Sequence, residues 1–117
     1  MKVTDVQLVD LAVGPNWEVR YNALHNLAPA DVPLVEGISS EDVWMLFSQD
    51  LVQIYHRGTR ELIDVGWYPD HNPDGLFRLI ALDPTTGENN YDWQNPRLEF
   101  ETRDLSHLLY QISTLTR

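Results

Sequence analysis

A short polar segment in the second half of the chain carries the residue pattern closest to a known chemical site. Asp70, Asn72, Asp74 and Gly75 match the opening of an EF-hand calcium loop, in which alternate side chains supply oxygen ligands and glycine permits a sharp turn. The twelfth position of such a loop needs a bidentate carboxylate, but this sequence has Ala81 there. Ordinary tight turns prefer the same residue types. We therefore expect a turn, with a calcium- or small-ligand-binding loop as the alternative.

Residue spacing favours no other catalytic or metal-binding arrangement. The four histidines have neither His-x-x-x-His nor His-Glu-x-x-His spacing, and there is no cysteine to act as nucleophile or ligand. No serine lies in a Gly-x-Ser-x-Gly motif, and the six glycines are dispersed rather than grouped in a phosphate-binding loop. We expect no catalytic residue, no metal and no cofactor, and we predict that the protein is not an enzyme.

The charge of the chain is strongly acidic, with 18 acidic and 8 basic residues and a net charge of −10. This balance argues against direct binding of nucleic acid or of an anionic membrane, because both require clustered Lys and Arg. Two stretches, residues 21–56 and 61–77, contain carboxylates but no Lys or Arg. They suggest an acidic face that docks on a basic protein. The alternative is a solvated surface that promotes solubility.

The elements that must position these residues form one domain over residues 1–117. The patterns predict an α+β fold with a mainly antiparallel sheet of about five to six strands, covered by a C-terminal amphipathic helix. The expected strands are 3–13, 17–24, 51–56, 62–67, 76–82 and 98–101. The run 76–82 is nearly all apolar, which is typical of a central strand covered on both faces.

Helix and turn signals complete this prediction. Apolar residues recur at helical spacing after Asp104, which suits the N-cap of a helix over about 105–115. Residues 40–47 form either a short helix capped by Ser39 or Ser40, or an extended run. The segment 57–60 joins two strand patterns as a hairpin, with Gly58 available for a positive φ.

Three segments of the chain resemble a small immunity-protein family of bacterial polymorphic-toxin and contact-dependent growth-inhibition systems. They are FSQDLVQI at 47–54, LIDVGWYP at 62–69 and YDWQNP at 91–96, and the resemblance covers roughly residues 45–115. It implies a non-catalytic cytoplasmic protein that neutralises a toxin domain, often a basic nuclease, by tight stoichiometric binding. It supplies no catalytic residue, and the contact positions of such proteins differ between members.

Candidate contacts with such a partner follow from charge and loop position alone. Aromatic residues at loop edges are frequent binding anchors, whereas Trp67 continues a strand and is expected in the core. The candidate contacts are Tyr68, Asp70, Asp74, Glu88, Asp92 and Trp93. The chain has no signal-peptide pattern and no apolar run of membrane-spanning length, so we expect a cytoplasmic protein. An accessory subunit of a larger complex is a further alternative, and the oligomeric state stays open.

Overall fold

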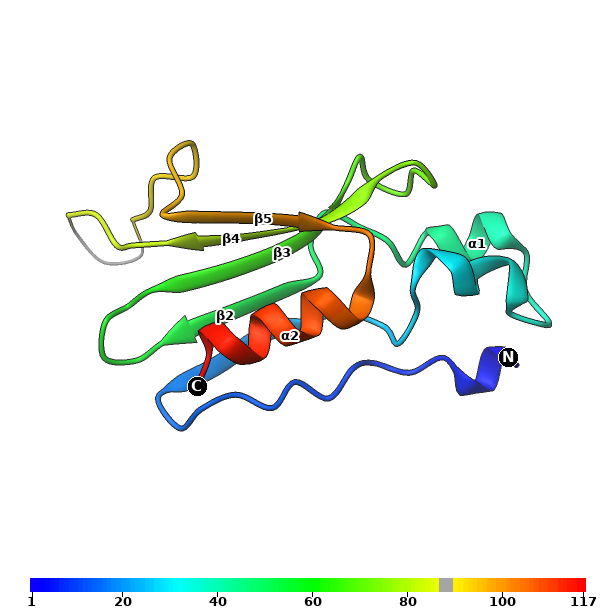
Figure 1. The fold of residues 1–117 in the computed structure, drawn as a ribbon, viewed down its shortest axis with the longest axis horizontal. Helices are drawn as coiled ribbons and strands as arrows, with labels where there is room; N and C mark the ends of the chain where they lie inside the picture. The colour runs from blue at the N-terminus through cyan, green and yellow to red at the C-terminus, as the bar shows by residue number, and fades with distance from the viewer. Residues whose placement is uncertain (87–89) are drawn as a thin grey trace.

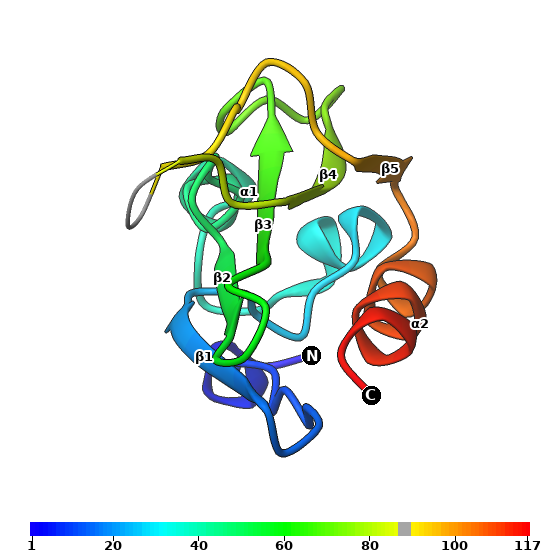
Figure 2. The same cartoon turned by 90° about the vertical axis from the view of Figure 1, so that its left-hand side faces the viewer.

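The computed structural model contains one five-stranded antiparallel sheet with a long C-terminal helix on one face (Figures 1 and 2). It describes residues 1–86 and 90–117. In chain order the elements are the 3₁₀ helix η1 (Val3–Asp5), β1 (Trp17–Asn22), the 3₁₀ helix η2 (Pro29–Leu34), α1 (Ser40–Trp44), β2 (Val52–His56), β3 (Leu62–Tyr68), β4 (Leu76–Leu82), β5 (Leu98–Thr102) and α2 (Leu105–Leu115). The strands are neighbours in the order β1-β2-β3-β4-β5, and the predicted α+β fold is confirmed.

The two faces of the sheet differ because successive side chains of a strand point to opposite sides. The inner face carries the main core, where Ile63, Val65 and Trp67 of β3 are buried together with Leu108 and Ile112 of α2. The outer face carries a smaller cluster, in which Tyr55 and Tyr91 pack against three buried residues, Leu62, Ile80 and Leu82. In the described residues no helix packs on this outer face (Figure 2).

The strand β4 has the central position that its apolar sequence predicts. It lies between β3 and β5 in the sheet. Leu79 is buried in the main core, whereas Ile80 and Leu82 are buried in the outer cluster. Each face of β4 is therefore covered by side chains. Its neighbour β5 alternates between half-buried and exposed residues, so Glu99 and Glu101 face solvent as expected.

Both α-helices begin at a capping residue, and the predicted start of α2 is confirmed. Asp104 precedes α2, and its Oδ1 accepts hydrogen bonds from the backbone N–H groups of Ser106 (2.8 Å) and His107 (3.2 Å). For the segment that was open between helix and extended chain, the structure has the short helix α1. Its N-cap is Ser39, whose Oγ accepts a hydrogen bond from the backbone N–H of Asp42 at 3.2 Å.

The hairpin between β2 and β3 forms as predicted, but the residue with positive φ is Arg60 (φ 63°) and not Gly58. The backbone N–H of Arg60 donates to the carbonyl of His56, so the chain makes one helical turn that Arg60 ends in the left-handed region. The His56 Nδ1 atom accepts hydrogen bonds from the N–H groups of Gly58 and Thr59. The expectation for Gly58 was wrong because the loop closes through this α-turn.

The strand predicted at residues 3–13 does not form, and the sheet accordingly has five strands. Residues 3–5 form η1, and Leu8 makes only an isolated bridge to His25. The apolar side chains of this segment still pack against the main core; they are Val6, Val9, Leu11 and Val13. The alternating apolar residues are thus the buried side chains of an extended segment. This segment hydrogen-bonds to the loop after β1 and adds no strand to the sheet.

Candidate partner-binding site

A row of polar side chains crosses the outer face of three neighbouring strands. The register places Tyr21 of β1 opposite Gln53 of β2, and Gln53 opposite Asp64 of β3. The pairing of β1 with β2 shifts between Val19 and Tyr21, where Arg20 is the extra residue. A bulge of this kind changes the face on which the following side chain lies. In a regular register Tyr21 would point toward the core, and Arg20 would lie opposite Gln53 in its place.

This row forms part of a surface hollow between β1, β2 and β3, which we call the β2–β3 hollow. Its volume is about 320 Å³, and its lining residues are Tyr21, Asp50, Leu51, Val52, Gln53 and Asp64. Sites for small ligands span roughly 300–1,000 Å³, so the hollow is large enough for one long side chain.

The segment 48–50 runs along the β2 side of β3 and brings Asp50 to the hollow. The backbone N–H of Trp67 donates to the carbonyl of Ser48 at 2.8 Å. Gly66 permits this close approach, because a Cβ at that position would overlap the carbonyl oxygen of Gln49. The position of Asp50 therefore depends on the absence of a side chain at residue 66 of the neighbouring strand.

Asp70, one of the expected contact residues, helps to hold the same segment. Its Oδ1 accepts a hydrogen bond from the backbone N–H of Gln49 at 2.8 Å, and its Oδ2 lies 3.5 Å from Nδ1 of His71. Tyr68 is half-buried beside it, and its hydroxyl donates to the carbonyl of Gln49 at 3.4 Å. These two residues position the rim near the hollow and remain available at its edge.

Asp64 is the most buried acid of the site, with 9% of its surface exposed. Its Oδ2 accepts a hydrogen bond from Nε2 of Gln53 at 3.0 Å. Burial raises the pKa of Asp64, and the nearby charge of Asp50 raises it further, whereas the Gln53 hydrogen bond and Arg78 act in the opposite direction. The Gln53 hydrogen bond and Arg78 therefore do not fully offset the cost of burying the ionised Asp64 carboxylate.

The neighbouring arginines are engaged elsewhere on the outer face. The guanidinium of Arg20 lies 3.6 Å from the ring centroid of Tyr55. Arg78 donates from Nε to Oε1 of Glu99 at 2.8 Å, and this hydrogen bond lowers the pKa of Glu99. Among the described residues no Lys or Arg makes an ion pair with Asp50 or Asp64.

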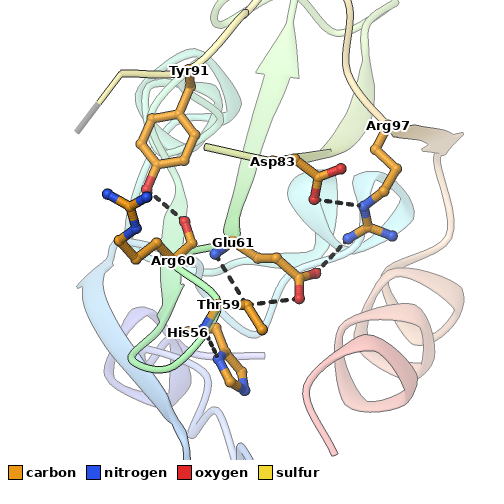
Figure 3. Close-up of polar contacts among 7 residues, drawn as sticks. All are labelled: His56, Thr59, Arg60, Glu61, Asp83, Tyr91 and Arg97. Carbon is orange, nitrogen blue, oxygen red and sulfur yellow. Dashed lines mark hydrogen bonds and ion pairs between the residues drawn. The ribbon is translucent and has the colours of Figure 1, made fainter. Parts of the chain in front are cut away.

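The opposite end of the sheet has carboxylates with arginine partners (Figure 3). We call this region the turn end and define it by residues 57–61, 83, 91 and 97. Arg97 bridges two acids: its Nη2 lies 2.6 Å from Oε2 of Glu61, and its Nε lies 3.1 Å from Oδ1 of Asp83. The hydroxyl of Tyr91 donates to the carbonyl of Arg60 at 2.7 Å. These contacts tie the β2–β3 turn to the β4–β5 connection.

The residues expected to contact a partner lie at two ends of the sheet rather than in one patch. Tyr68 ends β3, and Asp70 and Asp74 follow it in the β3–β4 connection, whereas Asp92 and Trp93 belong to the β4–β5 connection (Figure 1). The seven residues of β4 separate the two groups by roughly 20 Å. Glu88 lies outside the described residues.

The two groups also differ in their surroundings. The carboxylate of Asp92 accepts hydrogen bonds from the side-chain amide of Asn95 and from the backbone N–H of Gln94. The hydrogen bond from the Asn95 amide is the main cause of the lowered pKa of Asp92. Trp93 beside it is 48% exposed. Asp74 is exposed, and its backbone N–H donates to Oδ1 of Asn72 at 2.8 Å. Neither Asp74, Asp92 nor Trp93 lines the β2–β3 hollow.

The 70–75 segment has the contacts of an ordinary turn. The Trp67 indole donates to the carbonyl of Asn72 at 2.8 Å, and Nη1 of Arg103 donates to the carbonyls of Pro73 and Gly75. This guanidinium brings positive charge to loop oxygens, which opposes binding of a cation there. Within residues 1–86 and 90–117, no group of three or more His, Cys, Asp or Glu could hold a metal ion.

Tyr21, Asp50, Gln53 and Asp64 were not among the expected contacts. A local signal for two of them is present in the sequence, because Gln53 and Asp64 are polar residues inside otherwise apolar strands. A charged residue in such a run is seldom buried unless it is paired or functional. The position of Tyr21 depends on a bulge, and that of Asp50 on the close approach of the 48–50 segment to Gly66, neither of which the sequence indicates.

Comparison with known proteins identifies no relative of this chain. No family model, no curated protein and no solved structure matches the chain. Among the described residues, no helix is both long enough and apolar enough to cross a lipid bilayer.

Proposed function

We propose that this chain is a non-catalytic immunity protein, which binds and neutralises a basic toxin domain in the cytoplasm. The observation that carries the proposal is the meeting of the two stretches without Lys or Arg. Asp50 and Gln53 come from the first stretch and Asp64 from the second, and they line one hollow. Local clustering of this kind would direct a cationic partner to a particular face, which uniform acidity would not do.

The sequence segments with the immunity-protein resemblance contribute to this same region. Asp50 and Gln53 lie in 47–54, and Asp64 and Tyr68 lie in 62–69. Two of the three resembling segments, 47–54 and 62–69, therefore lie where the two stretches without Lys or Arg meet, whereas the third, 91–96, lies in the β4–β5 connection. We therefore assign the main contact to the hollow and its rim at Tyr68 and Asp70, with Asp92 and Trp93 as a separate, secondary group.

The test begins with the neighbouring upstream gene: if it encodes a basic C-terminal domain, that domain is expressed with and without the chain. We expect the chain to restore growth and to form a one-to-one complex. The variant Asp50→Asn/Asp64→Asn should weaken both effects. The matched control Glu61→Gln/Asp83→Asn removes the same charge at the turn end and should retain them. Absence of protection and of a complex with the wild-type chain would overturn the proposal.

Salt dependence tests the electrostatic part separately. Steered association slows as ionic strength rises, because the Debye length shortens from about 10 Å at 0.1 M to about 3 Å at 1 M. We expect the association rate constant to fall over this range in stopped-flow measurements. A rate that is independent of salt would contradict acidic steering and leave neutralisation to other contacts.

An accessory-subunit role is the second candidate, because a few exposed apolar residues gather near the N-terminus. Met1 and Leu34 are linked by a hydrogen bond from the terminal amine to the Leu34 carbonyl, and Val3 is exposed nearby. A partner bound through these side chains would associate independently of salt. The double substitution Val3→Ser/Leu34→Ser would weaken such a complex and spare one made through the hollow.

A further inference from the structure

We infer that the β2–β3 hollow binds one guanidinium group, supplied by an arginine side chain of the protein partner. The assignment to a protein partner rests on the proposed function, whereas the guanidinium chemistry rests on the lining of the hollow. Asp64 and Gln53 supply its floor and Asp50 its edge, with Tyr21 on the β1 side.

Three carboxylate or amide groups of the hollow present unused hydrogen-bond acceptors. Gln53 donates one of its two amide N–H groups to Oδ2 of Asp64, and its own Oε1 and the Oδ1 of Asp64 have no donor among the described residues. The Asp50 carboxylate likewise accepts no side-chain or backbone hydrogen bond there. A guanidinium carries five N–H donors and no acceptor, so it complements this set.

The free oxygen of Asp64 is accessible from the hollow. The side chain is nine-tenths buried, yet no buried side-chain nitrogen or oxygen of the described residues lacks a hydrogen-bond partner. The Oδ1 atom is therefore not completely buried, and Asp64 belongs to the lining of the hollow. A hydrogen bond from a cation to a carboxylate is roughly twice as strong as one between neutral groups. Asp64 is the group from which we expect the largest contribution.

Arginine fits this site better than lysine for two reasons. The acceptors belong to three separate positions, and the planar guanidinium can donate in several directions at once, whereas an ammonium is a compact and strongly hydrated charge. Tyr21 offers an aromatic ring that is 47% exposed. The outer face already stacks a guanidinium on a tyrosine in this way, at Arg20 and Tyr55.

The experiment is an NMR titration of the ¹⁵N-labelled chain with N-acetyl-arginine amide, and in parallel with N-acetyl-lysine amide. We expect saturable shifts at the Gln53 side-chain amide and at the backbone of residues 21, 50 and 64. The arginine derivative should bind more tightly. Asp64→Asn should raise the dissociation constant for it at least about tenfold, since hydrogen bonds to charged groups contribute about 1.5–3 kcal/mol.

The control variant Glu36→Gln removes one exposed carboxylate outside the hollow and should leave the dissociation constant unchanged. The unperturbed spectrum of each variant verifies its fold. Equal affinity for the two amides, or shifts spread over acids throughout the surface, would overturn the guanidinium assignment. The titration contains no toxin domain, so a negative titration does not bear on the growth assay of the proposed function. Conversely, if the wild-type chain binds the arginine amide but does not protect cells, only the proposed function is overturned.

Discussion

The turn end and the β2–β3 hollow each contain two carboxylates. Those at the turn end form ion pairs with an arginine, whereas those in the hollow do not. At the turn end, Arg97 contacts both Glu61 and Asp83 and joins two connections of the sheet. In the hollow, Asp50 and Asp64 lie near each other, and no Lys or Arg of the described residues makes an ion pair with them. The first arrangement uses charge within the fold. The second leaves these two carboxylates without a Lys or Arg partner among the described residues.

This difference changes the meaning of the net charge of −10. The acids at the turn end are largely balanced by the protein's own arginines, so they contribute little to an attractive field. The acids around the hollow contribute more, and one of them is held in a buried position where its ionised form is disfavoured. Retention of an unfavourable charge at a site of this kind is a common feature of functional positions.

The largest expected effect concerns the close approach that builds the hollow. Gly66→Ala introduces a Cβ that overlaps the Gln49 carbonyl, so the 48–50 segment must move. We expect a loss of about 1–3 kcal/mol in the free energy of unfolding, measured by urea denaturation. At the turn end, Gly58→Ala meets only the His56 side chain, which can shift, and should cost less. Equal losses would show that the segment is not held by this contact.

The second prediction concerns the pH dependence of stability. The folded-state pKa of Asp64 is raised above the ordinary aspartate value of 3.8, so the folded protein binds this proton more tightly than the unfolded chain. The stabilisation is present below pH 3.8 and is lost as the pH rises through the folded-state pKa. At neutral pH, Asp64→Asn should therefore raise Tm by roughly one to a few degrees.

Thermal unfolding of both proteins from pH 3 to pH 8 checks this sign. The gain from Asp64→Asn should grow with pH across the interval above 3.8 and then level off. A variant that is less stable than the wild type at neutral pH would mean that the carboxylate is stabilised by its surroundings, and the contrast with the turn end would be lost.

A smaller effect is expected for the arginine at the turn end. Arg97→Gln removes two ion pairs whose members are partly exposed. Exposed pairs contribute at most about 1 kcal/mol, and salt weakens them. We expect a loss below that value at low salt, and a still smaller loss at 1 M NaCl, with unchanged binding of N-acetyl-arginine amide. Loss of amide binding in this variant would show that the two regions are coupled.

The smallest effect is expected for calcium at the 70–75 segment. Arg103 donates to the carbonyls of Pro73 and Gly75, and Asp70 is hydrogen-bonded to the 48–50 segment. Millimolar calcium should therefore produce no binding heat in calorimetry and no rise in Tm. A saturable heat, removed by Asp74→Asn, would instead support the calcium-binding alternative and would add a second ligand site beside the hollow.

The local elements were well predicted because their causes are local. The hairpin 51–67, the apolar strand 76–82 and the helix after Asp104 are determined by spacing and caps within a few residues of chain. The segment 3–13 was mispredicted because an extended, alternating pattern shows which side chains are buried and does not specify hydrogen-bond partners. None of the residues that line the hollow was among the expected contacts, although two expected contacts, Tyr68 and Asp70, hydrogen-bond to the 48–50 segment that carries Asp50.

The sequence by itself determined the composition of this protein's charge, the two stretches without Lys or Arg, and the elements on which they lie. The tertiary structure alone decided which carboxylates are paired. A bulge after Val19 turns Tyr21 outward, and Gly66 admits the segment that carries Asp50. Arg97 reaches Glu61 across 36 residues of chain. Pairing depends on distance in space, and in this fold the sheet register and the close approach at Gly66 set those distances.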